Sequence, residues 1–324
     1  MLISGFTIVR NAVKLYYPVK ESILSVLPIV DEFIVAFGEG DVDDNSLDEI
    51  LSINDPKIRI IRREWDEKLF IGGKILAHET NFALSQCRGD WCLYIQADEV
   101  LHENDLPIIR RYCEAYKDET AVDGFLFPYH HFWGDYHREL CVHDFYKSEI
   151  RLIRNHIHCY SIKDAVSFRK GNDEKLWVLD IPAYVYHYGF VRPPSLMARK
   201  KNNAVHIYEG NPSNGSTVQD APFDYGPIGG IGIFNGSHPA VMRKKIENFF
   251  WRDQLNYAVR KPSDPVLHKH HRLRYRLVTW VENNWLNGRT LFGFKNFRRL
   301  SKSAFENVNH RNNDDVSGIV LRKT

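Results

Sequence analysis

The order of hydrophobic and polar residues in the first 120 positions alternates between two periods. Four apolar runs are too short for helices and predict buried strands, and after each run apolar residues recur at helical spacing. This alternation is typical of βαβ units in a parallel, doubly wound sheet. The predicted strands are residues 2–9, 33–37, 58–61 and 91–96, and the predicted helices are residues 18–27, 46–53, 75–87 and 105–116.

The pattern changes at Gly124, where short strand-like runs are separated by long segments. This middle part predicts mixed sheet with long loops, the usual place for binding residues. Helical spacing returns near the C-terminus, after a segment rich in Gly, Pro, Ser and Asn that predicts a loop or lid. The predicted elements are strands at 124–129, 149–153, 166–168 and 177–179, an aromatic and histidine-rich loop at 130–137, a lid at 209–240, and helices at 241–257 and 273–285.

Charge is distributed unevenly along the 324 residues, whose formal net charge is only +2. Residues 241–324 hold 18 Lys and Arg against 7 Asp and Glu, so a basic C-terminal part follows a mildly acidic body. Trp251, Trp280 and Trp285 lie among these basic residues. A helix pair at a membrane surface would give this pattern, as would a packed helical subdomain with a solvated basic face, which we favour. Nucleic-acid binding is not expected, because no recognised module accompanies the charge.

The five cysteines are odd in number and contain no C-x-x-C pair. They indicate reduced thiols in a cytosolic protein and disfavour a disulfide framework or a zinc site. The apolar N-terminus is too short for a signal peptide, and no apolar run approaches the length of a membrane span. We therefore expect a cytoplasmic protein, with a peripheral position at the inner membrane face as the alternative.

Candidate ligand-binding residues come directly after the fourth predicted strand in the sequence. Asp98 and Glu99 follow this strand, and open α/β sheets bind ligands outside the carboxyl ends of their strands. A carboxylate there is well placed to hold a divalent cation on a diphosphate, although two acids also suit the first turn of a helix. The chain lacks G-x-G-x-x-G after the first strand and lacks G-x-x-x-x-G-K-[ST]. A dinucleotide fold of the usual kind and a P-loop NTPase are therefore disfavoured.

Several stretches of the N-terminal half resemble family 2 glycosyltransferases of the GT-A fold. The resemblance is good over residues 1–110 and looser over residues 110–195. It implies a Rossmann-like nucleotide-sugar-binding domain with a mixed central sheet over residues 1–208. Composition and periodicity, and not the resemblance, predict the lid at 209–240 and a basic, mainly helical region at 241–324. The stretches that carry the resemblance are Ser4–Asn11, Val30–Val35 with Asp43-Asp44, Thr80–Leu84, and Gln96-Ala97-Asp98-Glu99 in place of the family's D-x-D motif.

The resemblance also implies roles for individual residues. Asp98 would hold Mn²⁺ or Mg²⁺ on the donor diphosphate, and His187 matches a late histidine that some GT-A enzymes direct at the metal or diphosphate. Asp164 would be the catalytic base, with Asp135 and Asp144 as rivals because both follow sheet strands. The residues expected to bind the nucleotide sugar are Thr7, Arg10, Asp44, Lys74, Asn81 and Gln96.

Two departures from the family pattern bear on function. Gln96 replaces the first acid of D-x-D, and an amide accepts hydrogen bonds but brings no charge. Asp43-Asp44-Asn45 lacks the glycine that commonly follows these acids. No Q-x-x-R-W pattern is present, which argues against a processive polysaccharide synthase.

The function expected from these features is metal-dependent, non-processive transfer of a sugar from a nucleotide-diphosphate donor, and the resemblance implies inversion at the anomeric carbon. A UDP-sugar is preferred, and the acceptor is a hydroxyl of a glycan or lipid-linked molecule. The alternative is a degenerate transferase that binds the donor without turnover, because Gln96 replaces an acid. A sugar-1-phosphate nucleotidyltransferase ranks lower, since no glycine-rich basic loop follows the first strand.

Overall fold

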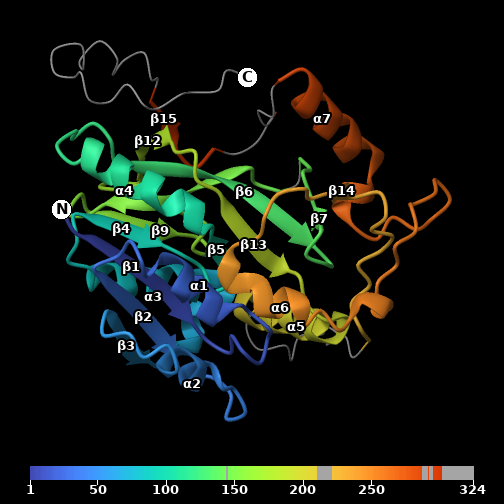
Figure 1. The fold of residues 1–324 in the computed structure, drawn as a ribbon, viewed down its shortest axis with the longest axis horizontal. Coiled ribbons are helices and arrows are strands. Elements are labelled where there is room, and N and C mark those ends of the chain that lie inside the picture. The colour runs from blue at the N-terminus through green and yellow to red at the C-terminus, as the bar shows by residue number, and fades with distance from the viewer. Residues whose placement is uncertain (144, 210–220, 287–290, 292–294, 301–324) are drawn as a thin grey trace.

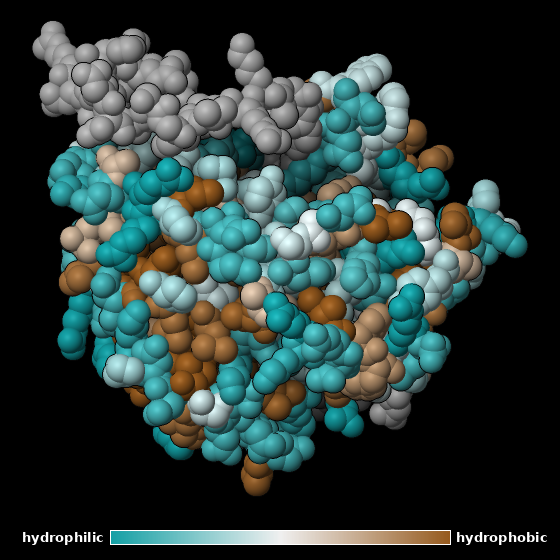
Figure 2. All heavy atoms as spheres, in the orientation of Figure 1, coloured by the Kyte–Doolittle hydropathy of each residue, from teal (hydrophilic) through white to brown (hydrophobic). Residues whose placement is uncertain are grey.

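A large mixed sheet with helices on both faces forms the centre of the protein (Figure 1). The computed structural model describes residues 1–143, 145–209, 221–286, 291 and 295–300. Hydrophilic residues cover most of the face seen in Figure 2, and hydrophobic atoms reach that surface only in limited areas. The fold class predicted from the sequence, an α/β protein with a mixed central sheet and a helical C-terminal region, is confirmed.

Four parallel strands form the N-terminal half of this sheet, in the order β3-β2-β1-β4. Beyond β4 the direction reverses, because β8 pairs antiparallel with both β4 and β6. β12 and β13 then lie parallel to β6. The bounds of these strands are β1 (Ile3–Val9), β2 (Glu32–Gly38), β3 (Ile58–Arg63), β4 (Trp91–Tyr94), β6 (Gly124–Trp133), β8 (Ser148–Arg154), β12 (Trp177–Asp180) and β13 (Val185–Phe190).

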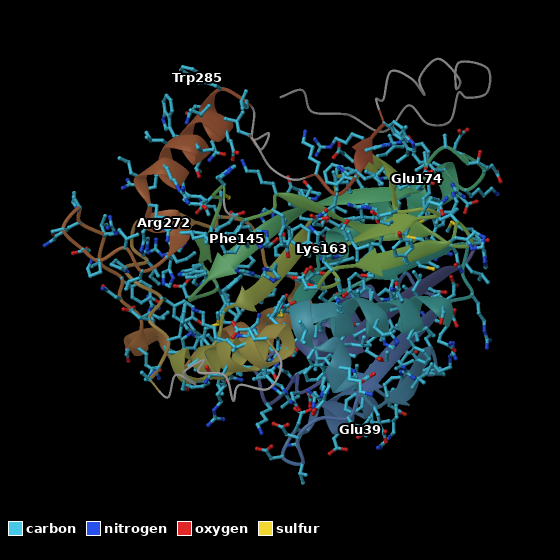
Figure 3. The ribbon with its side chains drawn as sticks, turned by 180° about the vertical axis from the view of Figure 1, so that it is seen from behind. Glu39, Phe145, Lys163, Glu174, Arg272 and Trp285 are labelled. Carbon is cyan, nitrogen blue, oxygen red and sulfur yellow. The ribbon has the colours of Figure 1, made fainter. Side chains whose placement is uncertain are left out.

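Alternating side chains of the central strands bury themselves on opposite faces of the sheet, as a period of two requires. In β2, Phe33 and Val35 pack in one hydrophobic cluster with α1 and α4, whereas Ile34 and Ala36 pack in another with α3. Figure 3, seen from behind, shows α3 over these strands. The helices are α1 (Val19–Val26), α2 (Ser46–Leu51), α3 (Lys74–Ser85), α4 (Leu106–Ala115), α5 (Pro194–Glu209), α6 (Arg243–Glu247) and α7 (Leu273–Asn284).

Short strands complete the architecture around this core. β5 pairs antiparallel with β13 and brings the segment after Asp98 against the end of β13. A separate three-stranded sheet, β11-β10-β9, lies beside the main sheet. The remaining strands are β5 (Glu99–Leu101), β7 (Arg138–Glu139), β9 (Cys159–Ile162), β10 (Ser167–Lys170), β11 (Glu174–Lys175), β14 (Gly232–Ile233) and β15 (Arg298–Arg299).

The aromatic and histidine-rich segment predicted as a loop at 130–137 is strand in its first half, 130–133, and turn in its second. β6 continues to Trp133, and its residues His130 and His131 pair with Tyr186 and His187 of β13. The prediction was wrong because this pairing satisfies the backbone, and it buries His131 between the two strands. The extension matters for function, because it sets His131 beside His187.

The C-terminal half corrects one expectation and shows how a second segment packs. The helix predicted at 241–257 ends at Glu247, because the chain leaves the helix to bury Trp251, whose indole donates to the Gly134 carbonyl. The predicted lid at 209–240 has an irregular backbone where it is described, yet Phe223 and Ile228 are buried in a core cluster around Trp133. Tertiary burial therefore overrides local propensity in both segments. The helix predicted at 273–285 is confirmed as α7.

Candidate active site

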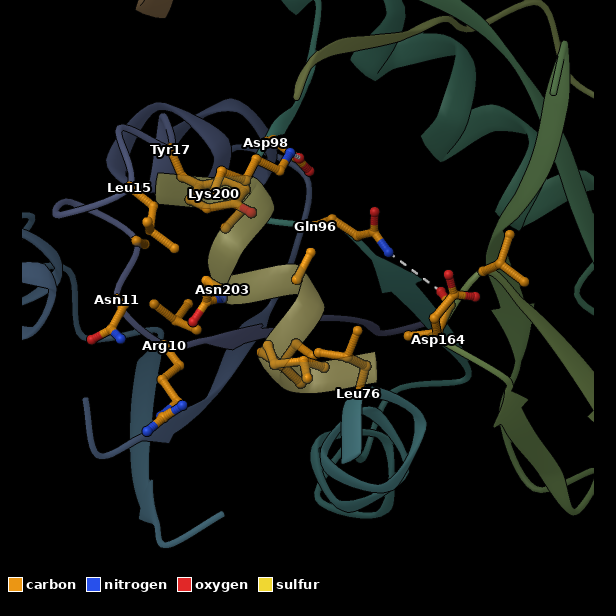
Figure 4. A pocket seen from close by; sticks show the side chains of 18 of the residues that line it. Arg10, Asn11, Leu15, Tyr17, Leu76, Gln96, Asp98, Asp164, Lys200 and Asn203 are labelled. Carbon is orange, nitrogen blue, oxygen red and sulfur yellow. Dashed lines mark hydrogen bonds and ion pairs between the residues drawn. The ribbon is translucent and has the colours of Figure 1, made fainter. Parts of the chain in front are cut away.

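A cavity of about 320 Å³ opens at the carboxyl ends of β1 and β4 (Figure 4). Helix α5 forms one wall, and the turn between β9 and β10 forms another. This is the edge at which ligands of open α/β sheets bind. The polar residues that line the cavity are Arg10, Asn11, Tyr17, Trp65, Tyr94, Gln96, Asp98, Tyr146, Arg151, Asp164, Lys200, Asn203 and Tyr208.

Asp98 is buried in this cavity and surrounded by positive charge. Its Oδ2 lies 3.3 Å from Lys200 Nζ and 3.6 Å from His187 Nε2. Burial alone would raise the pKa of Asp98, but the charges of Lys200, His187 and Arg192 outweigh it and hold the pKa well below its usual range. Asp98 is therefore an ionised carboxylate, which is the form that binds a cation.

A chain of hydrogen bonds orients the ring of His187. Nε2 of His131 lies 2.8 Å from the carbonyl oxygen of Tyr146, so this nitrogen must carry a proton. Burial, followed by the charge of His187, keeps the pKa of His131 well below 6.5, so its Nδ1 is free to accept a hydrogen bond. His187 Nδ1 lies 2.9 Å away and donates to it. His187 Nε2 then faces Asp98 Oδ2 at 3.6 Å, where it carries a proton toward the carboxylate when the ring is charged and would present a lone pair to a cation that takes the place of that proton.

Gly189 allows the backbone to pass close to these two groups. A Cβ atom at this position would lie 2.5 Å from His187 Nε2 and 2.7 Å from Asp98 Oδ2. The backbone N–H of Tyr188 donates to the carbonyl oxygen of Asp98, which ties β13 to the segment after β4. The contact between Asp98 and His187 therefore depends on glycine at position 189.

The arrangement of Asp98 Oδ2 and His187 Nε2 suits the binding of a divalent cation between them. A carboxylate oxygen and an unprotonated imidazole nitrogen repel each other unless a proton or a cation lies between them. Both are ligands for Mn²⁺, and the second hydrogen bond of His187 is the kind that orients a metal-binding imidazole. Among the residues that the structure describes, no three His, Cys, Asp or Glu side chains gather as a complete metal site. The protein would thus supply two ligands, and the diphosphate oxygens and water would supply the others.

Lys200 was not among the residues expected from the sequence. It comes from α5, which begins at Pro194 and was not predicted as a helix, although proline favours the first turn of a helix. Its Nζ also donates to the Gly189 carbonyl over 2.7 Å. Burial and the neighbouring Arg192 lower the pKa of Lys200 to about 8, against the opposing effect of Asp98.

A buried ion pair supports the floor of the cavity. Arg151 forms two hydrogen bonds of 2.8 Å with the carboxylate of Glu99, and Tyr129 donates to the same carboxylate. Glu99 also accepts from the backbone N–H of Gln96, so it fixes the turn that carries Gln96 and Asp98. Glu99 therefore holds the loop in place and has no free coordination position for a ligand.

Asp164 lies across the cavity from Lys200, in the turn between β9 and β10 (Figure 4). The hydroxyl of Tyr208 on α5 donates to its Oδ2 over 2.5 Å. Its two neighbours have left-handed backbones, with φ of 55° at Lys163 and 61° at Ala165. Such conformations cost roughly 1–3 kcal/mol each outside glycine and often mark functional turns. Gln96 points to the same turn and donates to the Ala165 carbonyl.

The structure brings together only some of the site residues that were predicted from the sequence. Arg10, Gln96, Asp98 and Asp164 line the cavity, and His187 adjoins Asp98. The other predicted donor-binding residues are not among the lining residues. Thr7 is buried within β1, Asp44 accepts from the Lys14 backbone, Lys74 is exposed at the start of α3, and Asn81 is hydrogen-bonded to the backbone of Ser161.

The other two candidates for the catalytic base are Asp135 and Asp144, and the structure describes only Asp135. Asp135 is buried outside the cavity, where it accepts hydrogen bonds from the His137 backbone and the Tyr257 hydroxyl. Both oxygens are therefore committed to holding a turn. Asp144 lies outside the described residues.

The sequence model of glycosyl transferase family 2 matches residues 16–177, half of the chain. The chain therefore belongs to this family and is a glycosyltransferase. No curated protein matches it in sequence. Among the described residues, no helix is both long and apolar enough to cross a membrane.

Solved structures that match this chain share little sequence with it. S. aureus TarS is 18% identical with a TM-score of 0.37, and the match covers 68% of this chain and 41% of TarS. A complex of TarS 1-349 with UDP-GlcNAc is 15% identical with a TM-score of 0.36 and covers 68% of each chain. Glucosyl-3-phosphoglycerate synthase from Mycobacterium tuberculosis, with Mn²⁺, UDP and phosphoglyceric acid, is 16% identical with a TM-score of 0.27, covering 40% of this chain and 43% of the other. This chain thus spans less than half of full TarS.

Proposed function

We propose that the chain is a metal-dependent, non-processive, inverting glycosyltransferase that moves a hexosyl group from a UDP-sugar to an acceptor hydroxyl. The acceptor would be a glycan or a lipid-linked molecule. The observation that carries this proposal is the ionised, buried Asp98 facing His187 Nε2 and Lys200 Nζ in a cavity at the sheet edge. Family membership supports the reaction class. The choice of uridine follows from the resemblance given above.

Asp98 and His187 would hold the cation, with Mn²⁺ preferred over Mg²⁺ because an imidazole is one of the two ligands. When bound, the cation neutralises charge that develops on the leaving diphosphate. Lys200 adds a second positive charge from α5, and it lies close enough to Asp98 to reach the same diphosphate oxygens. Arg10 and Gln96 line the same cavity and remain our candidates for contacts to the nucleotide and sugar.

Asp164 is our candidate for the catalytic base. It would accept the proton of the acceptor hydroxyl while that oxygen attacks the anomeric carbon, and the bond from this carbon to the diphosphate would break. Attack from the face opposite the leaving group inverts the configuration through an oxocarbenium-like transition state. The position of Asp164 across the cavity from Asp98 supports this role, as does its strained turn.

The remaining expected residues and domain limits also stay proposals. We retain residues 1–208 as the catalytic domain, with 209–240 and 241–324 as added segments. Thr7, Asp44, Lys74 and Asn81 would act on the donor only through movements of the segments that carry them, because they do not line the cavity as described.

The test is release of nucleoside diphosphate from UDP-, GDP-, CDP- and TDP-sugars, each with Mn²⁺, Mg²⁺ or EDTA. We expect Mn²⁺-dependent release from a UDP-sugar by the wild type, and its loss in Asp98→Asn. A second candidate, donor binding without turnover, is motivated by Gln96 in place of an acid. It would be supported by UDP binding without release from any donor, and that outcome would overturn the proposed activity.

A further inference from the structure

Helix α7 presents an apolar stripe with flanking arginines to the outside, whereas Glu282 and Thr279 face the protein. Glu282 is fully buried on the inner side, where its carboxylate contacts His143 Nδ1 over 2.6 Å and Lys147 Nζ over 2.9 Å. Thr279 accepts from the backbone N–H of His143 on the same side. These contacts fix the rotation of the helix about its axis.

The outward side carries Leu273, Leu277 and Trp280, which are 68%, 56% and 53% exposed. At 3.6 residues per turn, these three side chains fall within about 60° of one another around the helix. Trp285, at the end of the helix, is 73% exposed and points away from the body in Figure 3. Hydrophobic atoms are visible in Figure 2 at the margin of the molecule where α7 lies. A surface helix of a globular protein ordinarily has the opposite arrangement.

Arginines flank this apolar stripe on both sides. Arg272, Arg274 and Arg276 are exposed, and by helical geometry the last two lie on either side of the line through Leu273 and Leu277. Tryptophan and leucine between basic residues are typical of a helix that lies in the interface of an anionic bilayer. Isologous contact with a second copy would instead bring two basic segments together, since residues 241–324 hold 18 basic against 7 acidic residues.

We propose that the stripe Leu273, Leu277, Trp280 and Trp285 with its flanking arginines docks this protein on the surface of an anionic lipid bilayer. The inner side of α7 is linked to the cavity through the chain segment 143–147. His143 and Lys147, which hold Glu282, flank Tyr146 in the chain, and Tyr146 lines the cavity. A lipid-linked acceptor would follow only from the proposed function, and the membrane contact itself does not rest on that function.

The test is sedimentation of the full-length protein with vesicles of phosphatidylcholine alone or mixed with phosphatidylglycerol, at low and high salt. We expect binding to the anionic vesicles that high salt weakens, and at least about tenfold weaker partitioning for the double variant Leu277→Glu/Trp280→Glu. Leu51→Glu is the matched control, because Leu51 is also 56% exposed but lies on α2. It should bind like the wild type.

Two results would overturn the proposal. One is equal sedimentation of the wild type and the double variant. The other is absence of vesicle binding together with a dimer that the double variant dissociates, which would assign the face to a second copy. Circular dichroism and thermal unfolding of each variant show that it is folded. Loss of vesicle binding with normal UDP release separates the membrane contact from the proposed activity.

Discussion

Lys200 Nζ lies 3.3 Å from Asp98 Oδ2, so a side chain of α5 already contributes a cation where the donor diphosphate would bind. The two residues are 102 positions apart, and α5 brings them together. If Lys200 contacts the diphosphate and also neutralises Asp98 before the metal binds, its removal has two opposite effects. It weakens the binding of the nucleotide and strengthens the binding of the metal ion.

Replacing Lys200 by methionine should therefore weaken UDP binding in the presence of Mn²⁺ by roughly 10- to 100-fold, the usual effect of losing a charged hydrogen bond. The same variant should bind Mn²⁺ alone more tightly than the wild type does. Calorimetric titrations of both ligands measure these effects. Arg199→Met is the control, because Arg199 is exposed on the preceding position of α5. Unchanged affinities in Lys200→Met would remove Lys200 from the site.

Asp164→Asn should lower kcat for UDP release from a UDP-sugar by about 10²–10⁴-fold, since an amide cannot accept the proton. UDP affinity should stay near that of the wild type. Asp135→Asn separates this effect from general damage, because Asp135 holds a buried turn away from the cavity. We expect it to lower stability while the remaining folded protein keeps its kcat. Normal turnover in Asp164→Asn would place the base elsewhere.

Gly189→Ala should impair the metal site without a large change of charge. The added methyl group would come within 2.5 Å of His187 Nε2 and 2.7 Å of Asp98 Oδ2, so one of these side chains must move. We expect Mn²⁺ affinity to fall by at least about tenfold, in line with the effect of misplacing groups around a metal. Calorimetry with Mn²⁺ and UDP measures it. Gly230→Ala is a control for substitution of a glycine, because the nearest atom to its Cβ would lie 3.7 Å away, an ordinary van der Waals contact.

The buried pair of Glu99 and Arg151 should be essential for stability. Arg151→Met leaves the Glu99 carboxylate buried without its partner, and breaking such a pair typically costs about 3–5 kcal/mol of unfolding free energy. Urea unfolding of the two proteins measures the difference. A loss below about 1 kcal/mol would mean that water reaches this carboxylate and replaces the guanidinium.

His270 should make the protein less stable in mild acid. It is buried against Trp133, and burial lowers its pKa from 6.5 to about 3. Between these two values the unfolded chain binds a proton at this residue and the folded protein does not. The free energy of unfolding therefore falls as the pH drops from about 6.5 toward 3. Urea midpoints at pH 7 and pH 5 should differ less in His270→Phe than in the wild type, and equal differences would contradict the assignment.

The parts of the site that follow strands were predictable, and the parts contributed by distant segments were not. Asp98 could be found because it directly follows an apolar run, and strand ends define the ligand edge. Lys200 could not, because α5 has a weak apolar pattern and its place over the cavity depends on the packing of Met197 and Ile207. His131 was missed as a partner of His187 because its segment reads as an aromatic loop until β13 pairs with it.

The most direct test of the central claim is a calorimetric titration of UDP into wild-type protein and Asp98→Asn, each with and without Mn²⁺. We predict that Mn²⁺ tightens UDP binding to the wild type by at least about tenfold and has no effect on the variant, since Asp98 is one of two protein ligands for the cation. UDP binding that is equally tight with and without Mn²⁺ in the wild type would contradict the account, and so would a Mn²⁺ effect that survives in Asp98→Asn.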